Sequence, residues 1–267
     1  TAGGQFNDIL IINGDLIFRF PRTPDAAKTM ATETAILRGL QGHLPLPVPD
    51  PAYIGMDPHT GEQVFMGYRR IQGEPLWRET LESIGDEEVL GRIAVQLATF
   101  LRELHAFPVI EIDAHLPTAD GADYWTGMHT AFREELFGYM RPDARRGVER
   151  EFEAFLGDPS HFGWSPVLRH GDFGNENILY DPRARMITGV IDFGSAALGD
   201  PAADLASVPA LGDRFLDRFY LAYPDLATAS VRERAGFYRS TFALQQALWA
   251  LRVGDEEDFR DGIATYI

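Results

Sequence analysis

Three polar side chains between residues 170 and 194 offer a proton acceptor and two metal ligands. Asp172 stands in His-Gly-Asp-Phe-Gly-Asn-Glu-Asn, residues 170–177, which ends at Asn177, and Asp192 stands in Ile-Asp-Phe-Gly, residues 191–194. The Asp172 carboxylate can accept the proton of an attacking hydroxyl group. Asn177 and Asp192 supply oxygen ligands of the kind that Mg²⁺ takes beside nucleotide phosphates. Each tripeptide alone is a weak signal, but the combination in fixed order indicates phosphoryl transfer.

The residues between the two motifs predict a hairpin that brings the metal ligands together. Ile178–Tyr180 and Met186–Ile191 are β-rich runs, and the Asp-Pro-Arg-Ala-Arg sequence of residues 181–185 between them is typical of a turn. If Asn177 faces Asp192 across two antiparallel strands, the hairpin is centred in this turn. We therefore expect Asn177 and Asp192 to converge on one ion.

These motifs resemble those of the aminoglycoside phosphotransferase and choline-kinase-like family of small-molecule kinases. Protein kinases have Arg where this chain has Gly171, which points away from them. The later stretch Gly-Asp-Pro-Ala-Ala-Asp-Leu-Ala, residues 199–206, is also similar to this family. The resemblance implies an α+β, two-lobed protein-kinase-like fold with a small antiparallel-sheet N-lobe and a mostly helical C-lobe. The expected boundaries are 1–67 for the N-lobe, 68–73 for the hinge and 74–267 for the C-lobe.

The resemblance also assigns nucleotide-binding residues in the N-lobe. Gly3 and Gly4 would lie in the glycine-rich connection above the phosphates, which places the start of the chain inside that loop and leaves the preceding strand missing; the alternative is a plain glycine-rich tail. Arg19 stands where the family normally has the Lys that contacts the α- and β-phosphates, and Glu33 would be its partner. Arg keeps the charge but has a planar, forked head. Arg22 is the competing candidate for the phosphate contact.

The hinge is expected where a strand over residues 63–68 ends. There the family meets the purine edge with backbone groups, which leave little side-chain signature. The implied hinge residues are Tyr68, Arg69, Arg70 and Ile71. The implied cofactors are ATP or GTP, with no preference between them, and Mg²⁺.

Local patterns predict the surrounding elements. Asn13-Gly14 between the apolar runs 9–12 and 16–20 is a hairpin signal. Helices are expected over 26–40, 86–107, 123–157, 214–223 and 231–252, and residues 44–51 are expected to be extended. His105, near the end of the second helix, is interpreted as a core or capping histidine rather than a metal ligand, since no second ligand stands at metal spacing.

Composition excludes several other classes of protein. The 267 residues are 45% hydrophobic and include no cysteine, which excludes disulfides and thiolate chemistry. No apolar run is long enough to span a membrane, and no secretory signal is present, so a cytoplasmic location is expected. A net charge of −16 argues against nucleic acid or an anionic membrane as partner. No obligate protein partner is evident.

The negative charge lies almost entirely in the expected C-lobe. Residues 1–73 carry 7 acidic and 6 basic side chains, a balance of −1, so the remainder of the −16 belongs to residues 74–267. This excess would concentrate a cationic substrate, although general acidic solubility explains it equally well. Together with the resemblance, it favours an aminoglycoside as the hydroxylated acceptor. Alternatives are a macrolide, an amino alcohol, a hydroxy amino acid or a sugar, and also a non-catalytic nucleotide-binding module.

Five residues are the candidates for binding a cationic acceptor. They are Asp200, Glu256, Glu257, Asp258 and Trp249. In the competing interpretation, Trp249 belongs to the core and the acidic cluster is the solvated start of a helix.

Overall fold

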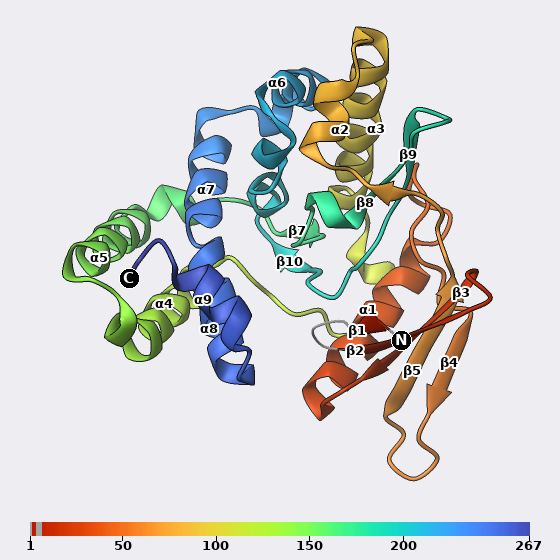
Figure 1. Ribbon diagram of the computed structural model, residues 1–267, viewed down its shortest axis with the longest axis horizontal. Coiled ribbons are helices and arrows are strands. Elements are labelled where there is room, and N and C mark those ends of the chain that lie inside the picture. The colour runs from red at the N-terminus through yellow and green to blue at the C-terminus, as the bar shows by residue number, and fades with distance from the viewer. Residues whose placement is uncertain (1, 4–6) are drawn as a thin grey trace.

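The N-lobe is one antiparallel sheet with a helix packed against it (Figure 1). The computed structural model describes residues 2–3 and 7–267. The strand order is β1-β2-β3-β5-β4. The bounds are β1 Ala2–Gly3, β2 Asn7–Ile12, β3 Leu16–Pro21, β4 Tyr53–Met56 and β5 Gln63–Arg69. The small antiparallel lobe expected from the family resemblance is therefore present.

The first predicted hairpin is confirmed. β2 pairs with β3 from Asn7 opposite Pro21 to Ile12 opposite Leu16. Asn13 and Gly14 both have positive φ, at 53° and 72°, a conformation that Asn and Gly tolerate best. The tight turn fixes the register, which places Arg19 in the middle of the sheet.

Helix α1, Pro24–Leu40, supports the inner face of this sheet. Thr23 caps it by accepting a hydrogen bond from the Ala26 N–H at 3.1 Å, and Pro24 occupies the first turn, so the helix begins two residues before the predicted 26. Its buried face carries Met30 and Leu37 together with Glu33. Burial of this one carboxylate points it toward the strand that carries Arg19.

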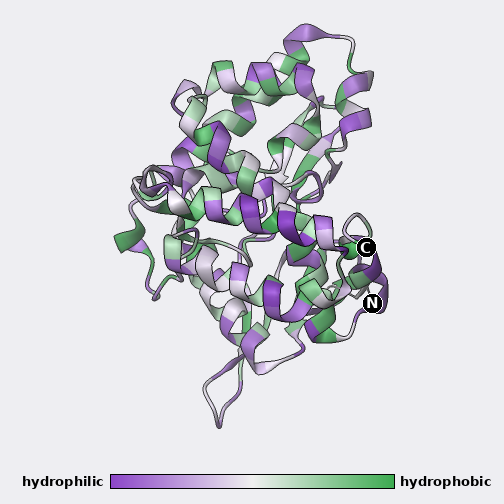
Figure 2. Cartoon of the chain, turned by 90° about the vertical axis from the view of Figure 1, so that its left-hand side faces the viewer, coloured by the Kyte–Doolittle hydropathy of each residue, from purple (hydrophilic) through white to green (hydrophobic). Residues whose placement is uncertain are grey.

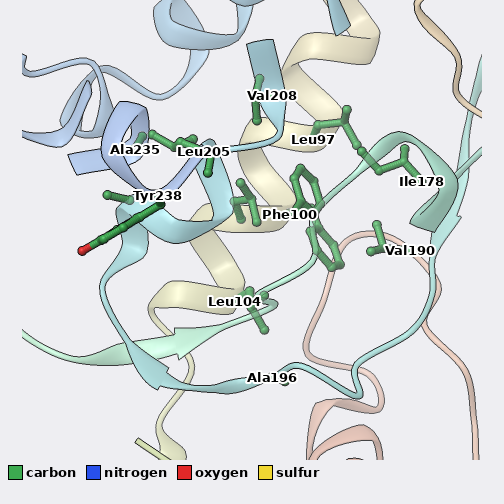
Figure 3. Packing of buried hydrophobic residues seen from close by; sticks show 14 of the residues in the cluster. Leu97, Phe100, Leu104, Ile178, Val190, Ala196, Leu205, Val208, Ala235 and Tyr238 are labelled. Atoms are coloured by element: carbon green, nitrogen blue, oxygen red, sulfur yellow. The ribbon is translucent and has the colours of Figure 1, made fainter. Parts of the chain in front are cut away.

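The C-lobe is mostly helical, as expected, and is built around one long helix (Figure 1). The helices are α2 Arg78–Ser83, α3 Glu87–His105, α4 Ala122–Ala131, α5 Pro142–Gly157, α6 Asp213–Ala222, α7 Ala229–Ser240, α8 Phe242–Val253 and α9 Glu256–Ile263. Asp86 caps α3 through hydrogen bonds from the next residues. Figure 3 shows Leu97 and Phe100 of α3 pointing toward Ile178 and Val190 of the predicted hairpin, residues 178–191. The Phe100 ring stacks on Phe173 at 5.9 Å, so the core reaches the catalytic loop directly.

Two predicted helices are each interrupted. The 123–157 stretch is α4, a π-helical turn over Phe132–Leu136 and then α5, because Pro142 disfavours helical backbone at Arg141, whose ψ is 154°. The 231–252 stretch is α7 and α8, separated at Thr241. The Thr241 hydroxyl donates a 2.7 Å hydrogen bond to the Tyr238 carbonyl, a local bond that competes with helix continuation.

Two small sheets carry the segment 170–194, which holds Asp172, Asn177 and Asp192. β7 Val167–Arg169 pairs with β10 Ala197–Gly199, and β6 Glu74–Pro75 pairs with β8 Ile178–Asp181, which in turn pairs with β9 Met186–Val190. The predicted β8–β9 hairpin is confirmed with a different register. Ile191 donates its N–H to the Asn177 carbonyl at 2.9 Å, so Asn177 faces residue 191 and not 192. The turn pairs Asp181 with Met186, which alone would place Asn177 opposite residue 190, and an irregularity between Leu179 and Tyr180 moves its partner by one residue to 191.

Hydrophilic and hydrophobic residues alternate along the helices (Figure 2). Within residues 2–3 and 7–267, no helix is both long and apolar enough to cross a bilayer.

Candidate active site

The catalytic loop holds Asp172 and Asn177 side by side. The Asn177 amide nitrogen donates to Asp172 Oδ2 at 2.8 Å and to the Asp172 carbonyl at 2.9 Å. Asp172 is exposed, whereas Asn177 is buried. Because both amide hydrogens are used on Asp172, the Asn177 Oδ1 oxygen is turned away from that carboxylate, which suits it to a cation. The convergence of Asn177 with Asp192 on one ion stays a prediction.

His170 links this loop to the segment that precedes Asp192. The His170 ring is fully buried, its Nδ1 accepts the Asp172 N–H at 3.2 Å, and its Nε2 lies 3.1 Å from the Ile191 carbonyl. A nitrogen that accepts an N–H carries no proton, so the ring is the tautomer that donates from Nε2. The sequence marked His170 as part of a motif but gave it no role. Its role here is to position Asp172.

Asp204 fixes the backbone of the loop that leads to Asp172. Its carboxylate accepts the His170 N–H at 3.0 Å and the Gly171 N–H at 2.7 Å, and lies 2.9 Å from His105 Nε2. Burial alone would raise the pKa of Asp204, but the His105 hydrogen bond and the other donors bring it below its ordinary value. His105 is therefore a buried core residue, as predicted. Asp204 lies in the 199–206 stretch, but its partners are too distant in sequence for that stretch to reveal its role.

Gly171 is required by a buried ion pair. Arg169 donates from Nε to Asp120 Oδ2 at 2.5 Å and from Nη2 to Oδ1 at 3.2 Å, and its Nη1 donates to the Ser195 carbonyl at 3.1 Å. A Cβ atom on Gly171 would lie 1.9 Å from Arg169 Nη1, and the residue has a φ of 83°. The sequence predicts no role for Arg169 or Asp120, because nothing local connects them.

Arg19 bridges the two lobes. Its Nη1 lies 2.6 Å from Glu33 Oε1, the predicted pair, and its Nη2 lies 3.7 Å from Asp192 Oδ1. Burial would lower the pKa of Arg19, but Glu33 and Asp192 more than offset this and raise it; burial raises the pKa of Glu33, opposed by Arg19. Arg22 instead pairs with Asp8 at the surface. This placement favours Arg19 over Arg22 for the phosphate contact.

Asp192 is held in an unusual backbone conformation. Its φ is 64°, which is uncommon for a residue other than Gly, and its side chain is 50% exposed. Asn and Asp tolerate this conformation best among the residues other than Gly, and it recurs at active sites and ligand clamps. No group of three or more His, Cys, Asp or Glu side chains gathers as a metal centre within residues 2–3 and 7–267. The candidate ligands are thus one amide and one carboxylate, a donor set that suits a hard cation such as Mg²⁺.

The other predicted nucleotide contacts lie as follows. Tyr68 and Arg69 end β5, and Ile71 follows it. The Arg70 N–H donates to the Asp15 carbonyl at 2.7 Å, so this N–H is already used within the N-lobe, and a contact of the Arg70 carbonyl with a purine stays a prediction. Gly3 lies on β1, opposite Asp8, so the strand expected to be missing is present as a short one and Gly3 is part of it. Gly4 lies outside the described residues.

One predicted acceptor ligand is wrong. Asp200 is fully buried, and its carboxylate accepts hydrogen bonds from Arg234 Nη2 at 3.0 Å, from the Tyr238 hydroxyl at 2.8 Å and from the Ala202 N–H at 3.0 Å. These partners leave it no access to a ligand. Part of the negative charge counted in the C-lobe sequence is therefore buried and paired, and is not available to an acceptor.

The other predicted acceptor residues lie on α8 and α9. Glu256 and Glu257 are exposed in the first turn of α9, Asp258 accepts a hydrogen bond from Gln246 at 3.1 Å, and Trp249 is half-buried on α8. Their role in binding stays a prediction.

Gly171→Ala should lower the free energy of unfolding by about 2–4 kcal/mol, since a Cβ at positive φ is strained and this one collides with a buried guanidinium. Urea denaturation measures the change. Gly147→Ala is the control: Gly147 lies in helix α5 with nothing within 4 Å of an added Cβ, so this change should stabilise the protein slightly. Equal effects would contradict the steric argument.

Asp204→Asn should lower the free energy of unfolding at pH 7 by about 2–3 kcal/mol, because hydrogen bonds to a charged group are lost. The pKa of Asp204 is lower in the folded protein than in the unfolded chain. Its stabilisation is therefore complete above the unfolded-state pKa, about 4, and is lost as the pH falls through the folded-state pKa. Denaturation at a series of pH values should show wild type losing stability below about pH 4 more steeply than the variant. Parallel curves would exclude this role.

Comparison with known proteins agrees with this geometry. The model of the phosphotransferase enzyme family matches residues 2–238. Viomycin phosphotransferase of Streptomyces vinaceus is 38% identical over 98% of this chain and 90% of its own length. An aminoglycoside 3'-phosphotransferase of Escherichia coli is 25% identical over 74% of this chain and 72% of its own length.

Solved structures show the same architecture. The GDP and kanamycin complex of an APH(2'') enzyme matches with a TM-score of 0.89 and 27% identity, over 99% of this chain and 90% of that one. A macrolide 2'-phosphotransferase type I, at 20% identity and a TM-score of 0.74 over 97% of this chain and 90% of that one, shares the fold. A family model that spans most of the chain and a relative this similar along its whole length lead to one conclusion: the chain belongs to the phosphotransferase enzyme family.

Proposed function

We propose that this enzyme transfers the γ-phosphate of ATP or GTP to a hydroxyl group of a cationic antibiotic, with viomycin as the first acceptor to test. The observation that carries the proposal is the geometry of Asp172, an exposed carboxylate with one oxygen fixed at 2.8 Å from the Asn177 amide. The nearly full-length similarity to a viomycin phosphotransferase supports the choice of acceptor. Aminoglycosides are the second candidate, supported by the aminoglycoside relatives.

In the proposed mechanism, Asp172 orients the acceptor hydroxyl and accepts its proton as the oxygen attacks the γ-phosphorus. The bond from the γ-phosphorus to the bridging oxygen breaks, and the nucleoside diphosphate leaves. Asn177 Oδ1 and the Asp192 carboxylate would hold Mg²⁺, which neutralises charge on the phosphates when it is bound. Most of the acceleration comes from positioning and electrostatics, because phosphoryl transfer needs little covalent help from the protein.

Arg19 is proposed to contact the phosphate chain. Glu33 holds one edge of its guanidinium at 2.6 Å, which leaves the side near Asp192 directed at the place where metal and phosphate would meet. The backbone near Tyr68 and Ile71 is proposed as the hinge between the lobes 1–67 and 74–267, where the nucleotide base would bind.

The exposed Glu256 and Glu257 are proposed to attract ammonium groups of the acceptor. A cytoplasmic location, where ATP and GTP are available, is also part of the proposal.

The test of this function is direct phosphorylation. Purified protein with Mg²⁺ and ATP or GTP should convert viomycin, or else kanamycin, to a product heavier by one phosphate group, detected by mass spectrometry together with nucleoside diphosphate release. Asp172→Asn should lower kcat by about 10²–10⁴-fold and leave nucleotide affinity near wild type. Asp217→Asn, an exposed carboxylate on α6, should change neither. Unchanged turnover in Asp172→Asn would remove Asp172 as the base.

Asp192→Ala should abolish the Mg²⁺-dependent part of nucleotide binding, measured by calorimetry with and without the metal, because the carboxylate ligand is lost. Asp192→Gly, which relaxes the left-handed backbone at this position, should show the same loss. Full affinity in both variants would mean that the metal is held elsewhere. A loss in Asp192→Ala alone would assign the effect to backbone strain.

A further inference from the structure

A pocket opens beside the loop that carries Asp172. It measures about 340 Å³ and is bordered by Gly171, next to Asp172, and by Gly194 and Ser195, which follow Asp192. Its other walls come from the residues before α4, from α4 itself, and from α7 and α8. The side chains that matter for its chemistry are Tyr124, Trp125, Arg169, Tyr238, Phe242 and Gln245. Its position next to Asp172 suits an acceptor.

The charges of this pocket are already paired. Among its described lining residues Asp120 is the one carboxylate, and Arg169 binds both of its oxygens. The Asp200 carboxylate, behind Tyr238, is taken by Arg234 and by the Tyr238 hydroxyl. A cationic group that enters this pocket would therefore find no free carboxylate in its wall.

Two exposed aromatic rings flank the pocket instead. Tyr124, at the start of α4, is 37% exposed, and Phe242, at the start of α8, is 42% exposed. Trp125 braces the Tyr124 ring edge-on at 5.1 Å and itself stacks on Tyr238 at 5.1 Å and 7°. The Tyr124 ring is thus held in place by a packed layer of aromatic side chains before any ligand arrives.

From this arrangement we infer that Tyr124 and Phe242 bind an ammonium or guanidinium group of the acceptor through cation–π contacts and so determine acceptor specificity. An aromatic face attracts a cation without needing a carboxylate, and a ring fixed beforehand, as Tyr124 is, loses little entropy on binding. The net charge of −16 attracts a cationic ligand to the protein. This inference rests on the proposed function, because it deepens the description of the acceptor.

The experiment measures acceptor affinity and turnover separately. Phe242→Ala and Tyr124→Ala should each raise the KM and the Kd for viomycin about tenfold, with kcat and the KM for nucleotide changed less than about threefold. Tyr139→Ala is the matched control: Tyr139 is a 51% exposed C-lobe aromatic that packs edge-on against Phe259, outside the pocket lining. It should leave all four values unchanged. Melting temperatures confirm that each variant is folded.

Conservative variants separate cation–π contact from simple apolar contact. Tyr124→Phe keeps the ring and should keep the affinity, whereas Phe242→Leu keeps an apolar side chain without a ring and should lose as much as Phe242→Ala. Wild-type affinity in Phe242→Leu would overturn the cation–π contact. Wild-type KM and Kd in both alanine variants would overturn the role of these residues.

Calorimetry with wild type keeps the two proposals distinguishable. If viomycin or kanamycin binds, weakens in the alanine variants and is not phosphorylated, the proposed function fails while the aromatic site stands. If phosphorylation occurs and the variants behave as wild type, only the aromatic site fails. If neither compound binds, both proposals fail.

Discussion

The catalytic loop depends on the buried carboxylate of Asp204. Removing an ion from water costs several kcal/mol even after the protein relaxes. A buried carboxylate without hydrogen-bond partners would therefore take up a proton and lose its charge. Asp204 accepts two backbone N–H groups and lies next to His105, and hydrogen bonds to a charged group contribute about 1.5–3 kcal/mol each, enough to offset that cost. Because the backbone donors belong to His170 and Gly171, the same bonds that stabilise the charge also fix the residue before Asp172.

A second buried charge pair shapes the other side of the loop. Arg169 and Asp120 join β7 to the segment before α4, and Arg169 also holds the Ser195 carbonyl, just beyond Asp192. The strands and loops that carry Asp172 and Asp192, the proposed base and the proposed metal ligand, are therefore tied through one guanidinium. This explains the Gly of His-Gly-Asp in this chain: a larger residue at 171 would occupy the space of the Arg169 head group.

What the sequence could predict follows from the distance between interacting residues. The Asn13-Gly14 hairpin, α3 and the β8–β9 hairpin carry local signals, and all three are present. The Arg19–Glu33 pair was expected only from the family resemblance. Asp120 and Asp204 were missed because their partners lie on other elements, and Asp200 was misassigned for the same reason: no local pattern distinguishes a buried carboxylate from an exposed one.

The acidity of the C-lobe then has two separate physical roles. Buried carboxylates bind groups of the protein itself. Asp204 accepts a hydrogen bond from the His170 N–H, and Asp200 pairs with the Arg234 guanidinium. Carboxylates at the surface, such as Glu256 and Glu257, are proposed to attract an approaching cation at a range set by the Debye length, about 8 Å at physiological salt. Contact at the pocket needs a different chemistry, because Asp120, the one carboxylate among the described residues that line it, is already bound by Arg169. Exposed aromatic faces beside a neutralised ion pair provide that chemistry, so attraction at long range and recognition at short range fall to different residues.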